Sequence, residues 1–519
     1  MKIKQIDIKN YRNFDNINLI FHPNLTFIIG ENNIGKTNIL DLLDTIFNKR
    51  SFYKDDFKDV NTAIEIELKL ELDNIEIGIF DDLFSPEKIT SENGSIEINL
   101  LIKQENPDDS IKIFHKETDE EISSRKLRFA NLIRYDPLRK PGDELDFSKS
   151  RGAGKFLSYL VKKHFNNEPN AYIKDSELTQ LISKINKDLE TFQYFHNLGV
   201  KVGYKKEVFD QILSLLDLLD KDEITIFSTG YGVQYNLIIF FYILNKTIEI
   251  LESEKKEDSI FTDTNGKKSI SLILCIDEPE IHMHPYMQRS LVKTVHKMLT
   301  NNDESFKNFL KENFNIDHIY GQAIIVTHSP NVLLNDYKQY VRLYYSKKLS
   351  SISGQSIQLE NAIEKHLYKQ IQYIKEAFFS KCVIIVEGDT EYGALPEWFE
   401  KSGIDMDMLG LSIIKADGKK SIKPLKKLLE KFGIECLTLA DKDDGNDNNY
   451  DFITNGRDFE EDVVNSLFDF SDNKEIEKKE LIYKILAEID PKNFNEEQRA
   501  SIKIEELNKE DTLRAPLKT

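Results

Sequence analysis

The feature that most constrains the fold is a glycine-rich turn between an apolar run and a helical pattern. The apolar run NLTFIIG ends at Gly30, and Gly35, Lys36 and Thr37 follow at the spacing G-x-x-x-x-G-K-T. The next residues, KTNILDLLDTIFNK, carry apolar side chains at intervals of three and four, which is typical of a helix. A strand, such a turn and a helix in succession predict a phosphate-binding loop in an α/β domain.

The residue types of this turn suit the phosphate chain of ATP. Glycines let backbone N–H groups surround a β-phosphate, and the start of a helix adds positive potential. Lys36 can bridge the β- and γ-phosphates, and the Thr37 hydroxyl can ligate magnesium. The alternative is a glycine turn with a solvated lysine. The predicted nucleotide-binding residues of the turn are Gly30, Asn32, Asn33, Gly35, Lys36, Thr37 and Asn38.

Two later apolar runs end in residues that would complete such a site. SLILCI is followed by Asp277 and Glu278, and AIIVT by His328. Asp277 suits the surroundings of a magnesium ion, Glu278 can polarise an attacking water, and His328 could reach a γ-phosphate. The alternatives are two surface acids at the end of a strand and a buried structural histidine. The order of the three motifs favours the nucleotide site.

Composition limits the class of protein. A chain of 519 residues implies two to four folding units, and 40% hydrophobic with 31% charged residues excludes disorder throughout. The balance of 70 basic against 89 acidic residues gives a net charge of −19, which argues against coating nucleic acid through bulk charge. Contact with DNA would therefore need a local basic patch or metal ions held by carboxylates.

The cysteines and the N-terminal pattern predict a cytoplasmic protein. Cys275, Cys382 and Cys436 each lie in an apolar run, so a disulfide framework is excluded and a reducing compartment is expected. The first residues alternate polar and apolar side chains, unlike a signal peptide. Since no uninterrupted apolar run approaches the roughly 18 residues of a membrane span, no membrane partner is expected.

Changes of periodicity predict how the first domain is organised. Between residues 61 and 115 apolar and charged residues alternate, which predicts an antiparallel sheet with one wet face. From about 150 to 222 the spacing becomes helical, which predicts a helical arm or dimerisation insert. The apolar positions that suggest this helical spacing at its end are Phe209, Ile212, Leu213, Leu216 and Leu219.

A polar, partly helical stretch predicts the boundary between two α/β domains. We expect an ATPase-like domain over residues 1–350, a linker over 351–375 and a second domain over 376–519. KCVIIVEGD, LSIIKADG and IECLTLADKD are three strands of buried type in the second domain, separated by helical spacing.

Carboxylates at the ends of two of these strands predict a metal site. Glu387 ends one strand, Glu391 follows where a helix begins, and Asp441 and Asp443 end another. Like charges at close range resist joint ionisation unless cations neutralise them. Oxygen ligands suit Mg²⁺ or Mn²⁺, and two such ions about 4 Å apart can stabilise both the attacking and the leaving oxygens of a phosphodiester. The alternative is a solvated acidic loop.

The motifs GENNIGKT, IDEPEIHMHP and VTHSP resemble ABC-type ATPases of the SMC and RecF kind, and especially the ATPase half of OLD-family (overcoming lysogenization defect) nucleases. The resemblance implies an ABC/SMC-type P-loop domain in which two halves close face to face around ATP. It also implies a Ser-Gly signature loop, and FSTGYGVQ, with Ser228 and Gly230, stands in that place although it departs from LSGGQ. His282 and His284 match the family's turn after the second motif rather than a zinc pair.

The motifs EGDTE and DKD resemble the TOPRIM domain of OLD-family nucleases. This implies a Rossmann-like α/β fold in which the first Glu, the Asp-x-Asp pair and a later acid hold divalent metal. DFEEDVV supplies candidates for that acid, and Glu460 is favoured over Glu461 and Asp462. Five acids are predicted to be both catalytic and metal-binding: Glu387, Glu391, Asp441, Asp443 and Glu460. Glu278 and His328 are predicted to be catalytic as well. Thr37 and Asp277 are further predicted metal-binding residues.

The resemblance implies an ATP-binding, metal-dependent DNA endonuclease of bacterial anti-phage defence. A composite ATP site implies a homo-oligomer. Partners implied by the family are a helicase, as in Gabija systems, or a reverse transcriptase with its RNA and DNA, as in some retrons. The alternatives are a non-cleaving RecF- or SMC-like ATPase switch, and a topoisomerase or primase, for which no accompanying module is visible.

One basic patch stands out in this acidic chain. It lies between the two metal-binding strands and includes only Asp417 and Glu430 as acids. It predicts contacts with DNA phosphates that carry no sequence information, and a helix with a solvated lysine face is an equal alternative. Its members are Lys415, Lys419, Lys420, Lys423, Lys426, Lys427 and Lys431.

Overall fold

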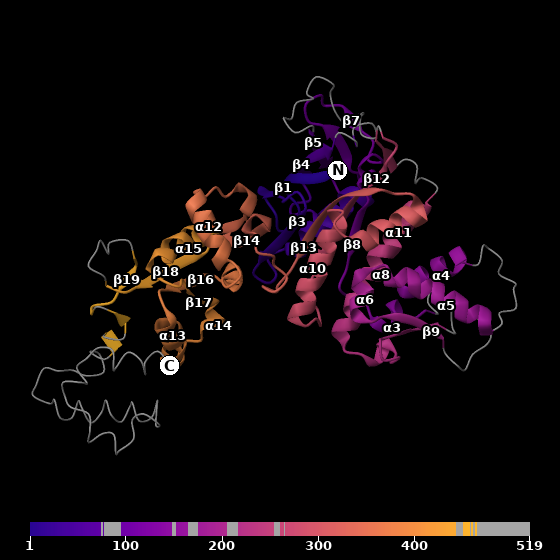
Figure 1. Ribbon diagram of the computed structural model, residues 1–519. Helices are drawn as coiled ribbons and strands as arrows, with labels where there is room; N and C mark the ends of the chain where they lie inside the picture. The colour runs from indigo at the N-terminus through magenta and orange to yellow at the C-terminus, as the bar shows by residue number, and fades with distance from the viewer. Residues whose placement is uncertain are drawn as a thin grey trace, which may run out of the picture. The chain divides into compact units, whose positions relative to one another are not determined.

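The computed structural model divides the chain into two compact units, Met1–Gln358 and a second that begins at Leu359 (Figure 1). The boundary falls inside the stretch expected to be the linker. The structure describes residues 1–73, 76, 95–147, 152–164, 175–204, 216–253, 260–263, 265–442, 450–456, 458–459 and 462–463.

A seven-stranded sheet forms the centre of the first unit. The apolar run before the predicted phosphate loop forms a strand that pairs in parallel with two strands that come much later in the chain. The strand ending at Asp277 pairs in parallel with the strand that precedes His328. The carboxyl ends of these parallel strands therefore meet at one edge. The order is β11 (Ile260–Thr262), β12 (Lys268–Asp277), β13 (His318–Val326), β3 (Leu25–Gly30), β14 (Tyr340–Ser346) and β15 (Lys348–Ser353), and β8 (Leu132–Tyr135) pairs with β12.

Helices pack against this sheet. Helix α1 (Lys36–Asn48) contacts β3, β12 and β13 and buries its apolar side chains, while α10 (Pro285–Leu299) contacts β13. Helices α8 (Tyr231–Glu252) and α11 (Glu304–Phe314) lie near α10 (Figure 1). The short 3-10 helices are η1 (Lys54–Asp56), η4 (Leu127–Ala130), η5 (Ile226–Ser228), η6 (Tyr337–Gln339), η7 (Gly354–Ser356) and η8 (Lys375–Phe379).

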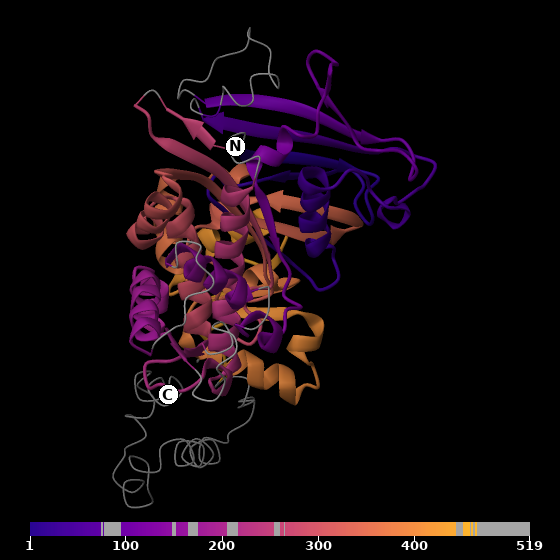
Figure 2. The ribbon, with the colours of Figure 1, turned by 90° about the vertical axis from the view of Figure 1, so that its right-hand side faces the viewer.

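The period-two segment forms an antiparallel lobe, seen at the top of Figure 2. Buried and partly exposed residues alternate along its longest strands, so the sheet has one core face and one wet face as predicted. The strand β2 was not expected from the sequence. The order is β2 (Ile17–Ile20), β1 (Lys2–Lys9), β4 (Ile64–Asp73), β5 (Ser95–Gln104), β6 (Lys112–His115) and β7 (Glu121–Ile122).

The predicted helical arm is only partly helical. Leu216 and Leu219 lie in β10 (Leu216–Leu219), which forms an antiparallel hairpin with β9 (Lys201–Tyr204), so the helical interpretation was wrong there. Pairing across the hairpin overrides the local spacing. Phe209, Ile212 and Leu213 lie outside the described residues. The helices within the predicted arm are α4 (Gly152–His164), α5 (Asp175–Glu190) and α6 (Gln193–Leu198), and α3 (Pro141–Glu144) precedes it.

The second unit is built on a four-stranded parallel sheet. Its three long strands are the three predicted from the sequence, and their carboxyl ends share one edge. The predicted α/β class of both units is confirmed. The strand order is β17 (Leu411–Lys415), β16 (Cys382–Val386), β18 (Glu435–Ala440) and β19 (Phe452–Ile453), and the helices are α12 (Asn361–Gln370), α13 (Asp389–Lys401), α14 (Met406–Leu409) and α15 (Lys419–Lys431).

Two further observations concern the described helices and the three cysteines. Among the described helices, none combines the length and the apolar character that crossing a bilayer requires. Cys275, Cys382 and Cys436 are free thiols.

Candidate functional site

The glycine-rich turn connects β3 to α1. Gly30 has φ +143°, and a Cβ there would lie 2.3 Å from the carbonyl oxygen of Leu343, so only glycine fits. The Lys36 ammonium donates hydrogen bonds to the carbonyls of Gly30 (2.9 Å) and Glu31 (2.6 Å). Burial lowers the pKa of Lys36 to about 8. A phosphate beside this ammonium would favour its charged form. Asn32 and Asn33 are exposed on the turn.

The end of β12 approaches the start of α1. The Thr37 hydroxyl lies 3.4 Å from an Asp277 carboxylate oxygen, and the Arg134 guanidinium lies 3.1 Å from the other oxygen. Burial raises the pKa of Asp277, and Arg134 opposes that shift. A hydroxyl beside a carboxylate is an oxygen donor set that suits Mg²⁺. Arg134, on β8, was not predicted, although a cation inside the apolar strand LIRY was a signal.

Glu278 and His328 meet at the edge shared by β12 and β13. The backbone of Glu278 is left-handed (φ 43°), and its N–H donates to the carbonyl of Val326 at 2.9 Å. His328 Nε2 lies 3.3 Å from Glu278 Oε1. Burial, followed by the charge of Lys36, lowers the pKa of His328. A carboxylate next to a neutral imidazole can hold and polarise a water molecule.

Glu280, like Arg134, is a site residue that was not predicted from the sequence. Its Oε1 accepts the backbone N–H of His328 at 2.6 Å, so it fixes the loop that carries this imidazole. Its Oε2 is buried and has no hydrogen-bond partner among the described residues. Burial raises the pKa of Glu280 to about 6. Its position two residues after Glu278 in DEPE was the available signal.

Replacing Glu280 with Gln is expected to stabilise the protein in a pH-dependent way. The folded chain holds the Glu280 proton more tightly than the unfolded chain, whose pKa is near 4.5, so ionisation costs stability above pH 6. The cost is on the order of 2 kcal/mol at pH 7.5 and disappears as the pH falls below 4.5. Urea unfolding of Glu280→Gln and wild type at pH 7.5 and pH 5 measures it.

The matched control for this prediction is Glu304→Gln. Glu304 is 75% exposed and pairs with Lys307 on the surface, so its replacement leaves the stability nearly unchanged at both pH values. A difference between Glu280→Gln and wild type that does not shrink towards pH 5 would contradict the burial argument.

Two side chains from the connection between β1 and β2 support the phosphate loop. Asn13 donates to the Ile34 carbonyl at 2.8 Å and accepts from the Asn38 amide at 2.9 Å. Arg12 donates to Asn38 (2.7 Å) and to Asp41 (2.8 Å). These contacts support the end of the turn and the first residues of α1. Arg12 and Asn13 follow β1, but spacing alone gave no reason to select them.

The predicted signature residues lie at the start of α8. Ser228 ends η5, Gly230 is the N-cap residue of α8, and Gln234 donates to the carbonyls of Phe227 and Thr229. A Cβ at the following glycine of the motif, Gly232, would lie 2.9 Å from the His282 carbonyl. The signature segment therefore packs against the turn that follows the second nucleotide-binding motif.

In the second unit, Glu387 and Asp441 come together at the carboxyl ends of β16 and β18. The Asp441 N–H donates to Glu387 Oε2 at 3.3 Å, and Asp441 Oδ1 accepts the N–H of Phe459 at 3.0 Å. The two strands are parallel neighbours, so their ends present both acids at the same edge. Carboxylate oxygens in this arrangement suit Mg²⁺ or Mn²⁺.

Of the other three predicted acids, the structure describes one. Glu391 lies in the first turn of α13, is 3% exposed and accepts the Gly388 N–H at 3.2 Å. Asp443 and Glu460 lie outside the described residues. Within the ranges that the structure describes, no group of three or more His, Cys, Asp or Glu side chains is placed to hold a metal ion.

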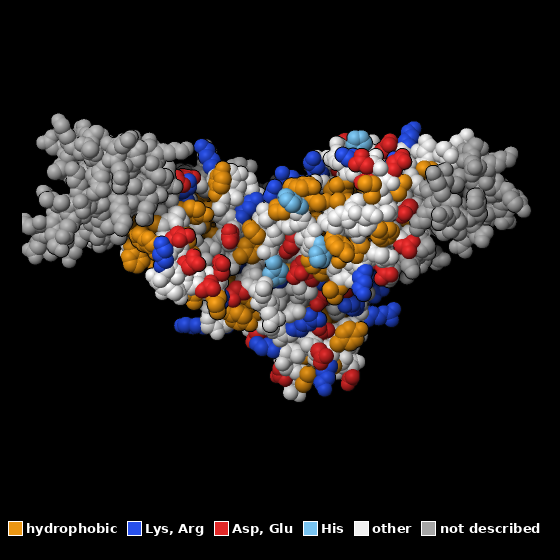
Figure 3. Space-filling view, turned by 90° about the horizontal axis from the view of Figure 1, so that it is seen from below, with side chains coloured by type: hydrophobic (Ala, Val, Ile, Leu, Met, Phe, Trp, Pro, Cys, Tyr) orange, Lys and Arg blue, Asp and Glu red, His pale blue; other side chains and the backbone are white. Residues whose placement is uncertain are grey.

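The lysines of the basic patch differ in their surroundings. Lys415 pairs with Asp389 at 2.7 Å, whereas Lys419 donates to the Asp441 carbonyl at 2.5 Å and, like Lys423, lies 5.4 Å from the centre of the Tyr450 ring. Acidic and basic side chains are interspersed on the described surface shown in Figure 3. Lys419, which was predicted only as part of the patch, thus lies next to the acids.

Two family models match the chain. A model described as "AAA domain, putative AbiEii toxin, Type IV TA system" matches residues 25–335, and one described as "Overcoming lysogenization defect protein-like, TOPRIM domain" matches residues 378–443. The first spans the phosphate loop and the His328 motif. The second spans the strands that carry Glu387 and Asp441.

Curated relatives match over much of the chain. Endonuclease GajA of Bacillus cereus (strain HuB5-5) is 25% identical, over 85% of this chain and 74% of the relative. Old nuclease of Escherichia phage P2 is 22% identical, over 85% of this chain and 77% of the relative. DNA replication and repair protein RecF of Lactococcus lactis subsp. cremoris (strain MG1363) is 25% identical, over 62% of this chain and 97% of the relative.

Proposed function

Because the chain belongs to the family described as "AAA domain, putative AbiEii toxin, Type IV TA system" and also carries an OLD-like TOPRIM domain, we propose that it is an ATP-regulated, divalent-metal-dependent DNA endonuclease. The resemblance to OLD-family nucleases that the motifs indicated is confirmed by homology to two named nucleases. The chain is thus a nuclease-type enzyme with an ATPase domain and a TOPRIM domain. Metal dependence, DNA as substrate and regulation by ATP are the proposed part.

The observation that carries the proposal is the meeting of Glu387 and Asp441 at adjacent strand ends. Bound there, Mg²⁺ or Mn²⁺ would polarise the phosphodiester and the attacking water. Glu387 and Asp441 would hold the ion, with Glu391, Asp443 and Glu460 as further candidates. Lys419, at the same edge, would orient the DNA backbone through its charge.

The first unit would bind ATP. The Lys36 ammonium would contact the β- and γ-phosphates, Thr37 and Asp277 would hold the accompanying Mg²⁺, and Glu278 with His328 would orient the attacking water. Ser228 and Gly230 of a second copy would close the site from the other side. ATP would then regulate cleavage through its different affinities for two arrangements of the enzyme.

The biological setting that we propose is cytoplasmic anti-phage defence by a homo-oligomer. Support comes from the toxin named in the family description and from the phage origin of the Old nuclease relative. A helicase, or a reverse transcriptase with its RNA and DNA, is the proposed partner. The signature segment at the start of α8, which a composite ATP site needs, supports the oligomer.

A second candidate function is a non-cleaving ATPase switch that binds DNA or a partner protein. The match to 97% of the length of RecF, over 62% of this chain, favours it. In this case the acids of the second unit would contribute no cleavage.

Supercoiled plasmid separates these functions. With Mg²⁺ or Mn²⁺ the enzyme is expected to convert plasmid to nicked or linear DNA, and addition of EDTA is expected to stop the reaction because the carboxylates alone cannot stabilise the leaving oxygen. Gel electrophoresis with and without ATP measures both metal dependence and regulation. ATP hydrolysis without DNA cleavage in either metal would instead support the switch.

A further inference from the structure

One face of the TOPRIM sheet carries an apolar surface that is open to solvent. Along β16 and β18, Val383, Ile385 and Cys436 are buried, whereas Leu437, which points to the other face, is 40% exposed. Helix α15 packs against β16 and β18, while α13 contacts β17. Strands of a parallel sheet are normally covered on both faces. The exposed side chain on a central strand therefore needs an explanation.

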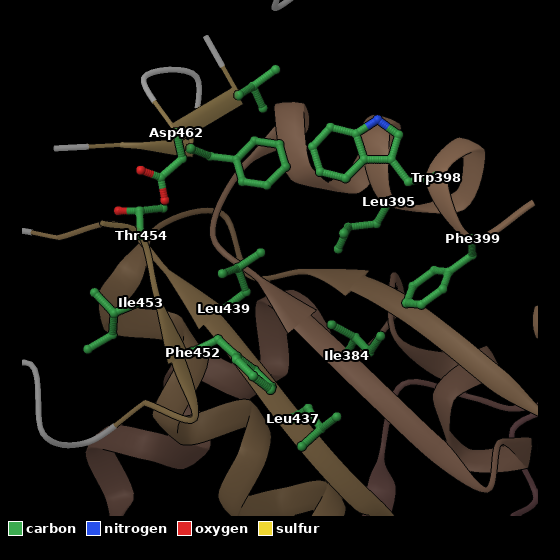
Figure 4. A pocket seen from close by; sticks show the side chains of 12 residues that line it. Ile384, Leu395, Trp398, Phe399, Leu437, Leu439, Phe452, Ile453, Thr454 and Asp462 are labelled. Carbon is green, nitrogen blue, oxygen red and sulfur yellow. The ribbon is translucent and has the colours of Figure 1, made fainter. Parts of the chain in front are cut away.

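The open surface forms a cavity of about 700 Å³ between α13 and the strands β18 and β19. Figure 4 shows its walls, with Trp398 on α13, Leu437 on β18 and Phe452 on β19. Trp398 is 42% exposed and Phe452 is 58% exposed. Large apolar side chains gathered in this way mark a surface that binds another apolar surface.

The sequence next to this cavity contains a segment of matching character. Val463 lines the cavity, and residues 464–519 follow it in the sequence. In that stretch Ile482, Ile485, Leu486 and Ile489 recur at intervals i, i+3, i+4 and i+7, which is the pattern of an amphipathic helix. We propose that residues 482–489 bind this cavity through these four side chains and cover the second face of the sheet.

The covalent connection favours this occupant over a second copy of the chain. Only 18 residues separate Val463 from Ile482, and a short tether of this kind gives an effective concentration in the mM range. A second copy would have to supply the same apolar contacts from dilute solution and lose its translational freedom. The tethered segment is therefore the stronger competitor for the cavity.

Occupation of the cavity has a direct connection to the candidate metal site. The Phe459 ring stacks on Trp398 with 5.4 Å between the ring centroids, and the Phe459 N–H donates to Asp441 at 3.0 Å. A segment that packs on Trp398 would restrain Phe459 and, through this hydrogen bond, the Asp441 carboxylate. The covering segment thus acts as a positioning element for the acids.

Trp398 is the only tryptophan of the chain, so its fluorescence tests the proposal without any cleavage assay. In the wild-type chain, we expect blue-shifted emission and weak quenching by acrylamide. In the double variant Ile482→Asp/Leu486→Asp, the emission is expected to shift to the red and the quenching constant to rise about twofold, because the surface around Trp398, which is 42% exposed in the structure, would then stay open to solvent. Lys484→Asp, on the opposite side of the helical pattern, is the matched control and is expected to behave as wild type.

The second variant changes the sheet instead of the segment. Leu437→Asp alters an exposed position and is expected to give the same increase in quenching by weakening the contact from the other side. Equal quenching of Trp398 in wild type, Ile482→Asp/Leu486→Asp and Leu437→Asp would overturn the proposal. Shielding that disappears when wild type is diluted would overturn it in favour of a second copy. Because the readout is independent of metal and DNA, failure of the nuclease proposal leaves this result interpretable.

Discussion

Replacing Glu387 with Gln is expected to lower the rate of plasmid cleavage by about 10³-fold or more, equivalent to about 4 kcal/mol of transition-state stabilisation. The amide keeps the size of the side chain and can still accept the Asp441 N–H, but it removes one charge of the pair that would hold the metal. Initial rates of supercoiled plasmid cleavage at saturating Mn²⁺ measure the change. Hydrolysis of ATP should stay within about twofold of wild type, because Glu387 belongs to the second unit.

Glu397→Gln is the matched control for the Glu387 variant. Glu397 is an exposed glutamate on α13, so its replacement removes the same charge from the same unit without touching the strand ends. Cleavage by Glu397→Gln is expected at the wild-type rate. Full cleavage by Glu387→Gln in every metal would contradict the assignment of Glu387 and Asp441 as metal-binding residues, and would leave the ATPase switch as the better account.

The second large effect is expected from Lys36→Ala, which should weaken ATP turnover by about 10²-fold or more. The Lys36 ammonium is held at the glycine-rich turn by two backbone carbonyls and is partly desolvated, so a bound phosphate would gain a strong charge-assisted contact there. Steady-state ATP hydrolysis and binding of a fluorescent ATP analogue measure the loss. Any dependence of plasmid cleavage on ATP should disappear in the same variant.

Lys49→Ala provides the comparison for the Lys36 variant. Lys49 caps the other end of α1 and pairs with Asp44 at 2.9 Å on the surface, where an ion pair contributes at most about 1 kcal/mol. We expect its ATP hydrolysis to match wild type. Undiminished ATP binding by Lys36→Ala would contradict the assignment of the turn as a phosphate site.

Sequence periodicity was sufficient for much of the fold because these elements bury continuous or alternating apolar faces. β12 and β13 are apolar along most of their length, and β4 alternates strictly, so each pattern has one simple interpretation. The hairpin of β9 and β10 was missed because each strand is only four residues long and its stability comes from pairing with the other strand, not from its own spacing of apolar residues. β2 was missed for the same reason.

The candidate site was predictable where function requires a residue at a fixed distance from a motif. Gly30, Asp277 and Glu387 stand at or just after strand ends, and Lys36 begins α1, each within a recognisable motif, so spacing was informative. Residues that act from other strands were not predictable in this way. Arg134 reaches Asp277 only because β8 pairs with β12, a neighbour relation that no local pattern contains.

The pairing of β14 with β3 connects the phosphate loop to a strand that comes more than 300 residues later in the chain. Leu343 lies opposite Gly30 in this pairing, so close that its carbonyl oxygen would be 2.3 Å from a Cβ at Gly30. Because the two strands are hydrogen-bonded neighbours at this point, a substitution that shifts Leu343 would also shift Gly30, and with it the start of the phosphate loop.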